Sequence, residues 1–228
     1  MSGNNNSQLR QAVELAQRYF AKVRDIYGEE LIGQFSLELP KIEKIYPSLD
    51  AFCQAVKDCR KCSLWKSRTN FVFGAGNPNA RMMLIGEAPG RDEDIQGIPF
   101  VGRAGQLLTR ILKAINLERE EVYIANILKC RPPGNRDPVE EEVRCCEPYL
   151  KKQIKMINPH IIVALGRVAA QNLLKTKKNL GELRGKEYIY RGVKLVVTYH
   201  PAAILRNPNL KRPTWEDVQW IRKLYDKE

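Results

Sequence analysis

The sequence lacks long apolar runs, and this bounds what the chain can be. No stretch of about 18 consecutive apolar residues occurs, so we expect no membrane-spanning helix. The first residues, 1–7, are polar and carry no apolar signal core, which predicts a cytoplasmic protein. Internal repeats and low-complexity segments are also absent. A chain of 228 residues with 43% hydrophobic and 28% charged residues is instead typical of one sizeable folded domain with an addition.

Acidic charge is scarce relative to basic charge. The chain has 38 Lys and Arg residues against 26 Asp and Glu, a formal net charge of +12. A basic excess of this size favours a polyanionic partner, most often nucleic acid. The alternative is a generally basic surface that only keeps the protein soluble.

Six cysteines are present, and in a cytoplasmic chain we do not expect them to form disulfides. Cys59 and Cys62 have the spacing of a metal clip, while Cys130 and the adjacent Cys145 and Cys146 lie far downstream. Four such thiolates suit either a tetrahedral zinc ion or a [4Fe–4S] cluster, and the spacing does not choose between them. Buried free thiols are the plainer alternative.

The N-terminal part differs from the rest in its pattern. Apolar residues recur at nearly helical spacing over residues 8–27, which predicts an amphipathic helix with Ser7 as its N-cap. Residues 28–48 contain Gly and Pro and little periodicity, so we expect a linker. We therefore predict an N-terminal helical extension with its linker over residues 1–47 and an α/β domain over residues 48–228.

From residue 48 onward, strand and helix patterns alternate. After a short helix at 48–55, strands are predicted at 81–87, 122–127, 161–166 and 194–200, and helices at 104–115, 139–157, 167–174 and 215–225. Strands rich in Ile, Val and Leu with helices between them are typical of a parallel sheet covered on both faces. The expected fold is a three-layer α/β/α sandwich with a central four-stranded parallel sheet.

Polar residues and glycines lie where these strands end. The first strand leads into a long loop, residues 86–105, with five glycines. Glu87, Asn126, Gly166 and His200 each come at or near the end of one strand. The carboxyl ends of parallel strands meet at one edge of a sheet, where open α/β folds bind their ligands. We therefore expect Glu87, Asn126 and His200 to meet in one crevice.

Several long segments carry a resemblance to a known family. They are Gly86-Glu-Ala-Pro-Gly90 with Gly97-Ile-Pro-Phe-Val-Gly102, Ala125-Asn126 with Lys129-Cys-Arg-Pro-Pro-Gly-Asn-Arg-Asp-Pro138, Cys146-Glu-Pro-Tyr-Leu150, and His200-Pro-Ala-Ala-Ile-Leu-Arg206. In this order they resemble the motifs of family 4 uracil-DNA glycosylases, over roughly residues 58–225.

The resemblance implies a [4Fe–4S] cluster held by Cys59, Cys62, Cys130 and Cys146. Cys146 is preferred to Cys145 because it precedes Glu-Pro-Tyr-Leu at the family's offset. Cys145, like Cys53, would then be a free thiol.

The resemblance also implies an activity. The chain would hydrolyse the N-glycosidic bond of deoxyuridine in single- and double-stranded DNA, release uracil and leave an abasic site, as a monomer in base excision repair. Residues 1–47 lie outside the resemblance and are candidates for binding a repair or replication partner. Two alternatives stay open: a nucleic-acid-binding module with a four-cysteine metal site and no glycosylase activity, and a glycosylase for another deaminated base.

The uracil pocket implied by the resemblance consists of Gly86, Glu87, Ala88, Phe100, Asn126 and His200. Phe100 would stack on the base, Asn126 would pair with the edge of uracil, and His200 would donate to the charge that develops on O2. Glu87 would position water with support from Glu93, so the expected catalytic set is Glu87, Glu93 and His200. The alternatives are core packing for Phe100, a strand-end cap for Asn126 and a structural hydrogen bond for His200.

DNA contacts are expected from basic residues beside these loops and from an apolar wedge. The candidates are Arg131, Arg136, Leu205 and Arg206, with Lys129, Lys211, Arg212 and Ile204 as further possibilities.

Overall fold

The chain divides into two compact units in the computed structural model, residues 1–45 and 46–228, and the structure describes residues 3–27 and 45–227. In the first unit, helix α1 spans Gly3–Tyr27. It begins before the expected position, so Ser7 is a residue of the helix and the prediction that it is the N-cap is wrong. Residues 28–44, most of the predicted linker, lie outside the described residues. The boundary after residue 47 stays a prediction.

The second unit is built on a six-stranded sheet with the order β1-β3-β2-β4-β6-β5. The strands are β1 (Ala75–Gly76), β2 (Met82–Gly86), β3 (Tyr123–Asn126), β4 (Ile161–Leu165), β5 (Tyr188–Tyr190) and β6 (Val193–Thr198). The four predicted strands, β2, β3, β4 and β6, pair in parallel, which confirms the central sheet. The prediction missed the antiparallel edge strands β1 and β5, because segments of two or three residues carry no periodic pattern.

Helices and turns connect and cover this sheet. They are α3 (Leu49–Val56), α4 (Arg91–Gln96), α5 (Arg103–Lys113), α6 (Glu140–Ile157), α7 (Arg167–Leu174), α8 (Leu180–Leu183), α9 (Pro201–Arg206) and α10 (Lys211–Lys227), with 3₁₀ turns at Ser63–Lys66, Pro133–Asn135 and Pro208–Leu210.

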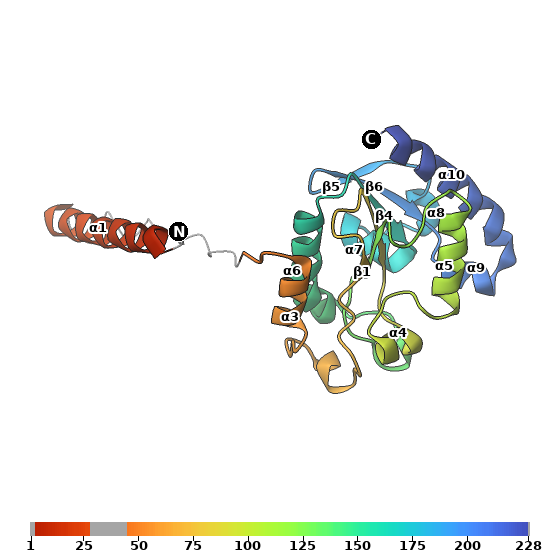
Figure 1. Cartoon of the computed structure of the whole chain (residues 1–228), viewed down its shortest axis with the longest axis horizontal. Helices are drawn as coiled ribbons and strands as arrows, with labels where there is room; N and C mark the ends of the chain where they lie inside the picture. Colours follow the sequence, from red (N-terminus) through yellow and green to blue (C-terminus); the bar gives the residue numbers. More distant parts are fainter. Residues whose placement is uncertain (1–2, 28–44, 228) are drawn as a thin grey trace. The chain divides into compact units, whose positions relative to one another are not determined.

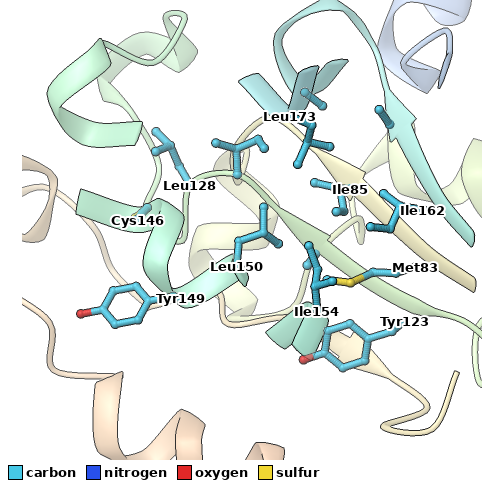
Figure 2. Close-up of a cluster of buried hydrophobic side chains, with 14 of the residues drawn as sticks. Met83, Ile85, Tyr123, Leu128, Cys146, Tyr149, Leu150, Ile154, Ile162 and Leu173 are labelled. Atoms are coloured by element: carbon cyan, nitrogen blue, oxygen red, sulfur yellow. The ribbon is translucent and has the colours of Figure 1, made fainter. Parts of the chain in front are cut away.

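Side chains of the central strands alternate between two buried layers, as strand geometry requires. On β2, Met83 and Ile85 belong to the layer with α3, α6 and α7, whereas Met82 and Leu84 belong to the layer with α5 and α10. Figure 1 shows α6 on one side of the sheet and α5 and α10 on the other. In Figure 2, side chains of α6 lie against those of the strands. The three-layer sandwich is therefore confirmed.

The order of the strands fixes where a ligand can bind. From β2 the chain crosses through α5 to β3 on one side, and from β3 through α6 to β4 on the other side of β2. Right-handed crossovers in opposite directions place α5 and α6 on opposite faces of the sheet. The loops after β2 and β4 therefore diverge, and a crevice opens at the carboxyl ends of the strands.

Two loops beside this crevice contain helices that the sequence reading missed. Residues 86–105 were expected to form one long loop, but residues 91–96 form α4, which begins after Gly90 and ends at Gly97 in the left-handed region (φ 71°). Its first turn carries three acidic residues, which favour a helix N-terminus. The segment after His200, for which no helix was predicted, forms α9 with His200 as its N-cap.

The layered core predicts a large difference between two isoleucines of the sheet. Ile162 of β4 is completely buried, whereas Ile189 of the edge strand β5 is 68% exposed. We expect Ile162→Ala to lower the free energy of unfolding by about 2–5 kcal/mol, because a buried side chain leaves a cavity. Ile189→Ala is the matched control and should change it by less than about 0.5 kcal/mol. Equal losses in chemical denaturation would contradict this layering.

Candidate active site

A cavity of about 460 Å³ opens at the carboxyl edge of the parallel strands. The loop after each of these strands contributes to its wall. Predicted site residues in the wall are Glu87, Ala88, Glu93, Phe100, Asn126, Arg136, His200 and Arg206. The fold thus brings together residues that lie more than one hundred positions apart in the sequence, as expected.

Asn126 is the most completely buried polar residue of the cavity wall. It is the last residue of β3 and is 2% exposed. Its side-chain oxygen Oδ1 is buried and has no hydrogen-bond partner among the described residues. A buried amide oxygen of this kind costs free energy until a donor reaches it. Asn126 also lines the cavity, so this unpaired acceptor belongs to a residue of the cavity wall.

Gly86 does not line the cavity but stands directly behind it. A Cβ atom at this position would lie 2.5 Å from Asn126 Oδ1 and 2.6 Å from the Phe100 ring. Only glycine leaves room for both side chains here. Gly86 was predicted to bind the base, but it lies behind the wall and makes room for two residues that line the cavity.

Phe100 forms the aromatic part of the wall. It is buried, packs with the core layer of α5 and α10, and lines the cavity, so it serves both as a core residue and as a cavity residue. Its ring centroid lies 5.4 Å from that of His200, at an interplanar angle of 32°. A planar ligand entering beside Asn126 would therefore meet an aromatic face and an imidazole together.

His200 follows β6 and caps α9. Its Nδ1 accepts a hydrogen bond from the Ala202 backbone N–H at 3.1 Å. Burial, and then the positive charge of Arg206, lowers the pKa of His200 to about 4. The imidazole is therefore neutral near pH 7, and because Nδ1 accepts, the proton resides on Nε2. His200 can donate one hydrogen bond to a ligand without carrying a charge.

Glu87 comes directly after β2 and is half-buried in the cavity wall. Burial raises its pKa to about 7; Asp137 acts in the same direction, while Arg167 and Arg206 oppose it. A carboxyl group with such a pKa can exchange a proton near neutral pH, which suits acid–base chemistry.

Glu93 lies in the first turn of α4 and also lines the cavity. Its Oε1 accepts hydrogen bonds from the backbone N–H groups of Val101 and Gly102, both at 2.9 Å. These contacts hold the segment that carries Phe100. Buried Asp94 anchors α4 in turn, since its carboxylate accepts from the backbone N–H of Thr69 at 2.9 Å.

The predicted DNA-contacting residues lie in different settings. Arg136 lines the cavity but binds Glu142 through both terminal nitrogens, at 2.6 and 3.0 Å. Arg206 is exposed on the cavity rim. Arg131 lies outside the cavity wall and donates to Asn135 Oδ1 at 2.8 Å. Leu205 is 46% exposed on α9.

Two of the further possibilities for DNA contact are wrong. Lys129 is completely buried, and its Nζ donates to the Asn126 backbone carbonyl at 3.0 Å and to Gln153 Oε1 at 2.6 Å. Burial lowers the pKa of Lys129 to about 7, against the opposing effect of nearby cysteines. Ile204 is buried and cannot act as a wedge.

Cys145 and Cys146 belong to α6, and Cys53, Cys59, Cys62 and Cys130 belong to or pack against the core layer that contains this helix. Arg68 Nη1 donates to Cys130 Sγ at 3.2 Å, and the Tyr149 hydroxyl donates to Cys59 Sγ at 3.1 Å. Burial is the main cause that raises the pKa of the Cys62 and Cys130 thiols. It raises the pKa of the Cys146 thiol to about 12. Mutual repulsion adds to it, between Cys130 and both Cys59 and Cys62, and between Cys146 and both Cys130 and Cys62.

None of the six cysteines forms a disulfide. Within residues 3–27 and 45–227, no three His, Cys, Asp or Glu side chains are arranged to hold a single metal ion. Cys145 Sγ donates to the Lys61 carbonyl at 3.2 Å, beside the clip.

Sequence reasoning missed several residues of the cavity. Asp137 and Arg167 form an ion pair of 2.5 Å, and both line it. Arg167 is the first residue of α7 and directly follows Gly166 at the end of a predicted strand. This position could have indicated that it lines the cavity. Asp137 lies within the motif of residues 129–138, but its place in the cavity wall depends on the path of the loop between β3 and α6.

Fold and cavity together define an α/β protein that presents amide, imidazole, carboxyl and aromatic groups at the carboxyl edge of its sheet. Residues 73–222 match the profile of the uracil DNA glycosylase superfamily, and the chain belongs to this superfamily, within its type-4 family.

Three relatives illustrate this similarity. A type-4 uracil-DNA glycosylase of Saccharolobus solfataricus is 49% identical over 77% of this chain and 86% of its own length. The type-4 uracil-DNA glycosylase of Archaeoglobus fulgidus is 48% identical over 79% of this chain and 95% of its own length. That of Sulfurisphaera tokodaii is 48% identical over 78% of this chain and 84% of its own length. The resemblance to family 4 seen in the motifs is thereby confirmed.

The environment of His200 predicts its titration. We expect an NMR titration of the imidazole to give a pKa of about 4, because the buried ring disfavours the charged form. The chain has two histidines, so His160→Gln leaves one imidazole signal and assigns it. A pKa at the ordinary value near 6.5 would contradict a neutral imidazole held by burial.

Proposed function

We propose that this chain is a monofunctional uracil-DNA glycosylase that hydrolyses the N-glycosidic bond of deoxyuridine in DNA and leaves an abasic site. The observation that carries the proposal is the buried, unpaired Oδ1 of Asn126 in a cavity that also holds Phe100 and His200. A base must leave the helix before its glycosidic bond can be reached, and a concave polar pocket with an aromatic wall is what a flipped base requires. Membership in the superfamily supports the same reaction.

Asn126 discriminates uracil from cytosine. Uracil has an N3–H donor that satisfies Oδ1, whereas N3 of cytosine is an acceptor and would leave two acceptors facing each other. A pocket that hydrogen-bonds one base rejects its analogue steeply, because the buried polar groups then stay unpaired. Phe100 offers the ring on which the base stacks, and the nearby backbone of Glu87 and Ala88 completes the pocket.

His200 stabilises the leaving base. Cleavage of the bond places negative charge on uracil O2, and a hydrogen bond aimed at that atom is worth more in a desolvated pocket than in water. The neutral imidazole donates it from Nε2 while Nδ1 stays on the Ala202 N–H. Because the imidazole is neutral, it stabilises the uracil anion through a hydrogen bond and does not transfer a proton to it.

Glu87 serves the sugar side of the reaction. As a carboxylate it positions the attacking water and stabilises the positive charge that develops on the deoxyribose. Its pKa of about 7 makes this form increasingly available as the pH rises through neutrality. Glu93 supports the pocket by holding residues 101 and 102 rather than by touching the reacting atoms.

Phosphates are proposed to bind along the rim of the cavity. Arg206 is exposed there, and Arg131 and Arg136 lie on the loop between β3 and α6. Leu205 projects from α9 and would enter the space that the flipped base leaves. DNA containing uracil, single- or double-stranded, is therefore the proposed substrate, bound by the protein as a monomer.

We further propose that Cys59, Cys62, Cys130 and Cys146 hold a [4Fe–4S] cluster. The donor set supports this: the four thiols come from three segments and repel one another electrostatically. Cys130 accepts a hydrogen bond from Arg68, and Cys59 accepts one from the Tyr149 hydroxyl. Hydrogen bonds of this kind stabilise thiolate ligands. The cluster would fasten the clip to the β3–α6 region and thereby support the cavity wall, with no part in bond cleavage.

The cellular setting of the protein is also proposed. No helix among residues 3–27 and 45–227 is long and apolar enough to cross a membrane. We propose that the protein acts in the cytoplasm, where thiols stay reduced, and that residues 1–47 contact a repair or replication partner. Helix α1 supports this because apolar residues recur along it, among them Leu15, Tyr19 and Ile26.

A uracil-release assay on a uracil-containing oligonucleotide tests the activity. We expect the wild-type protein to release uracil and Asn126→Ala to lower the rate by about 10²-fold or more, since the base loses its paired edge. Asn79→Ala, on an exposed turn, is the control and should stay fully active. Salt-sensitive DNA binding without release would instead favour a binding module, and release of hypoxanthine alone would favour another base.

Absorption spectroscopy tests the cluster. The anaerobically purified protein should absorb at about 400 nm, as [4Fe–4S] clusters do. The Cys130→Ser variant should lose both this absorption band and the bound iron. Cys53→Ser is the matched control and should keep both. A colourless wild-type protein that contains zinc would overturn the cluster.

A further inference from the structure

Phe100 is held in an unusual backbone conformation. Its φ angle is 54°, in the left-handed region that a bulky residue rarely adopts. Such a conformation persists only where surrounding groups determine it. The ring that lines the cavity is aimed by this backbone, so whatever holds the backbone also holds the ring.

Arg119 contacts this backbone from outside the cavity. It lies between α5 and β3, and its Nη1 and Nη2 donate to the carbonyl oxygens of Phe100 and Pro99 at 2.9 and 2.8 Å. Nη1 is also 3.4 Å from Thr109 Oγ1 of α5. A planar guanidinium donates to the two successive carbonyl groups from two nitrogens in a fixed fork, a geometry that the single ammonium nitrogen of a lysine does not reproduce.

The opposite polar side of the same segment is held by Glu93, through the N–H groups of residues 101 and 102. Gly105 closes the third side, since a Cβ atom there would lie 1.8 Å from the Phe100 carbonyl oxygen. Two charged side chains of opposite sign and one close backbone contact thus fix residues 99–102. Only Glu93 of these two side chains lines the cavity.

We propose that Arg119 is a positioning residue that fixes the Phe100 ring as the stacking platform for the base. This role rests on the proposed glycosylase function. Without the guanidinium, the carbonyl groups of Pro99 and Phe100 lose their donors, and Phe100 relaxes from its left-handed conformation. The ring then leaves the position from which it stacks on a base beside Asn126.

A purely structural arginine is available as a control. Arg222 of α10 also donates to two successive carbonyl groups, those of Ile115 and Asn116, at 2.9 and 3.1 Å. It is likewise half-buried, and it lies outside the cavity wall. Arg222→Met therefore removes the same kind of bracing without touching the segment of Phe100.

The test compares Arg119→Met with Arg222→Met in the full-length, cluster-containing protein. We expect Arg119→Met to raise the inhibition constant of free uracil and the KM for uracil-containing DNA by about tenfold, with a smaller change in kcat, because stacking contributes to ground-state binding. Arg222→Met should leave both constants at the wild-type values while lowering Tm by a similar amount. If Arg119→Met does not fold, Arg119→Lys, which keeps the charge but loses the fork, carries the same comparison.

Equal uracil inhibition constants for the Arg119 and Arg222 variants, in an enzyme that releases uracil normally as wild type, would overturn the role of Arg119 alone. Failure of the wild-type protein to release uracil would overturn the proposed function, and the role of Arg119 with it. The two failures are therefore distinguishable.

Discussion

The pairing of β2 with β3 on one side and with β4 on the other is the constraint on which the site depends. Because the neighbouring crossovers run in opposite directions, their helices cover opposite faces and the loops after the strands diverge. The functional groups of the cavity lie in or after the carboxyl ends of β2, β3, β4 and β6. The sheet itself needs only apolar side chains, so its carboxyl edge is free to carry polar ones.

Desolvation then gives these polar groups their properties. The same burial that lowers the pKa of His200 raises that of Glu87, since a low dielectric disfavours the charged form of both. Near pH 7 the cavity therefore holds a neutral imidazole beside a carboxyl group close to its midpoint. Asn126 adds an unpaired acceptor whose cost is offset when a ligand donor arrives. A site of this kind is prepared for a base that is polar but uncharged on entry.

The cavity wall is supported by buried and half-buried ionisable side chains. Lys129 joins the backbone of Asn126 to α6 through Gln153, next to the cysteines. Asp94 ties α4 to the segment after the clip, and Glu93 and Arg119 fix the segment of Phe100. Of these ionisable side chains only Glu93 lines the cavity, and the others support its wall from outside. Such groups are buried at a cost in free energy that is recovered only because each one is paired.

The sequence by itself determined the layered fold and the strand ends that carry the site. Apolar strands alternating with amphipathic helices define a parallel sheet, and the motifs that follow the strands are long enough to show the family. Tertiary structure alone decided the rest. The edge strands are too short for a pattern, and α4 depends on Asp94 binding a distant backbone. Packing between distant segments decides that Lys129 faces the core and that Arg119 reaches Phe100. Local sequence does not encode this packing.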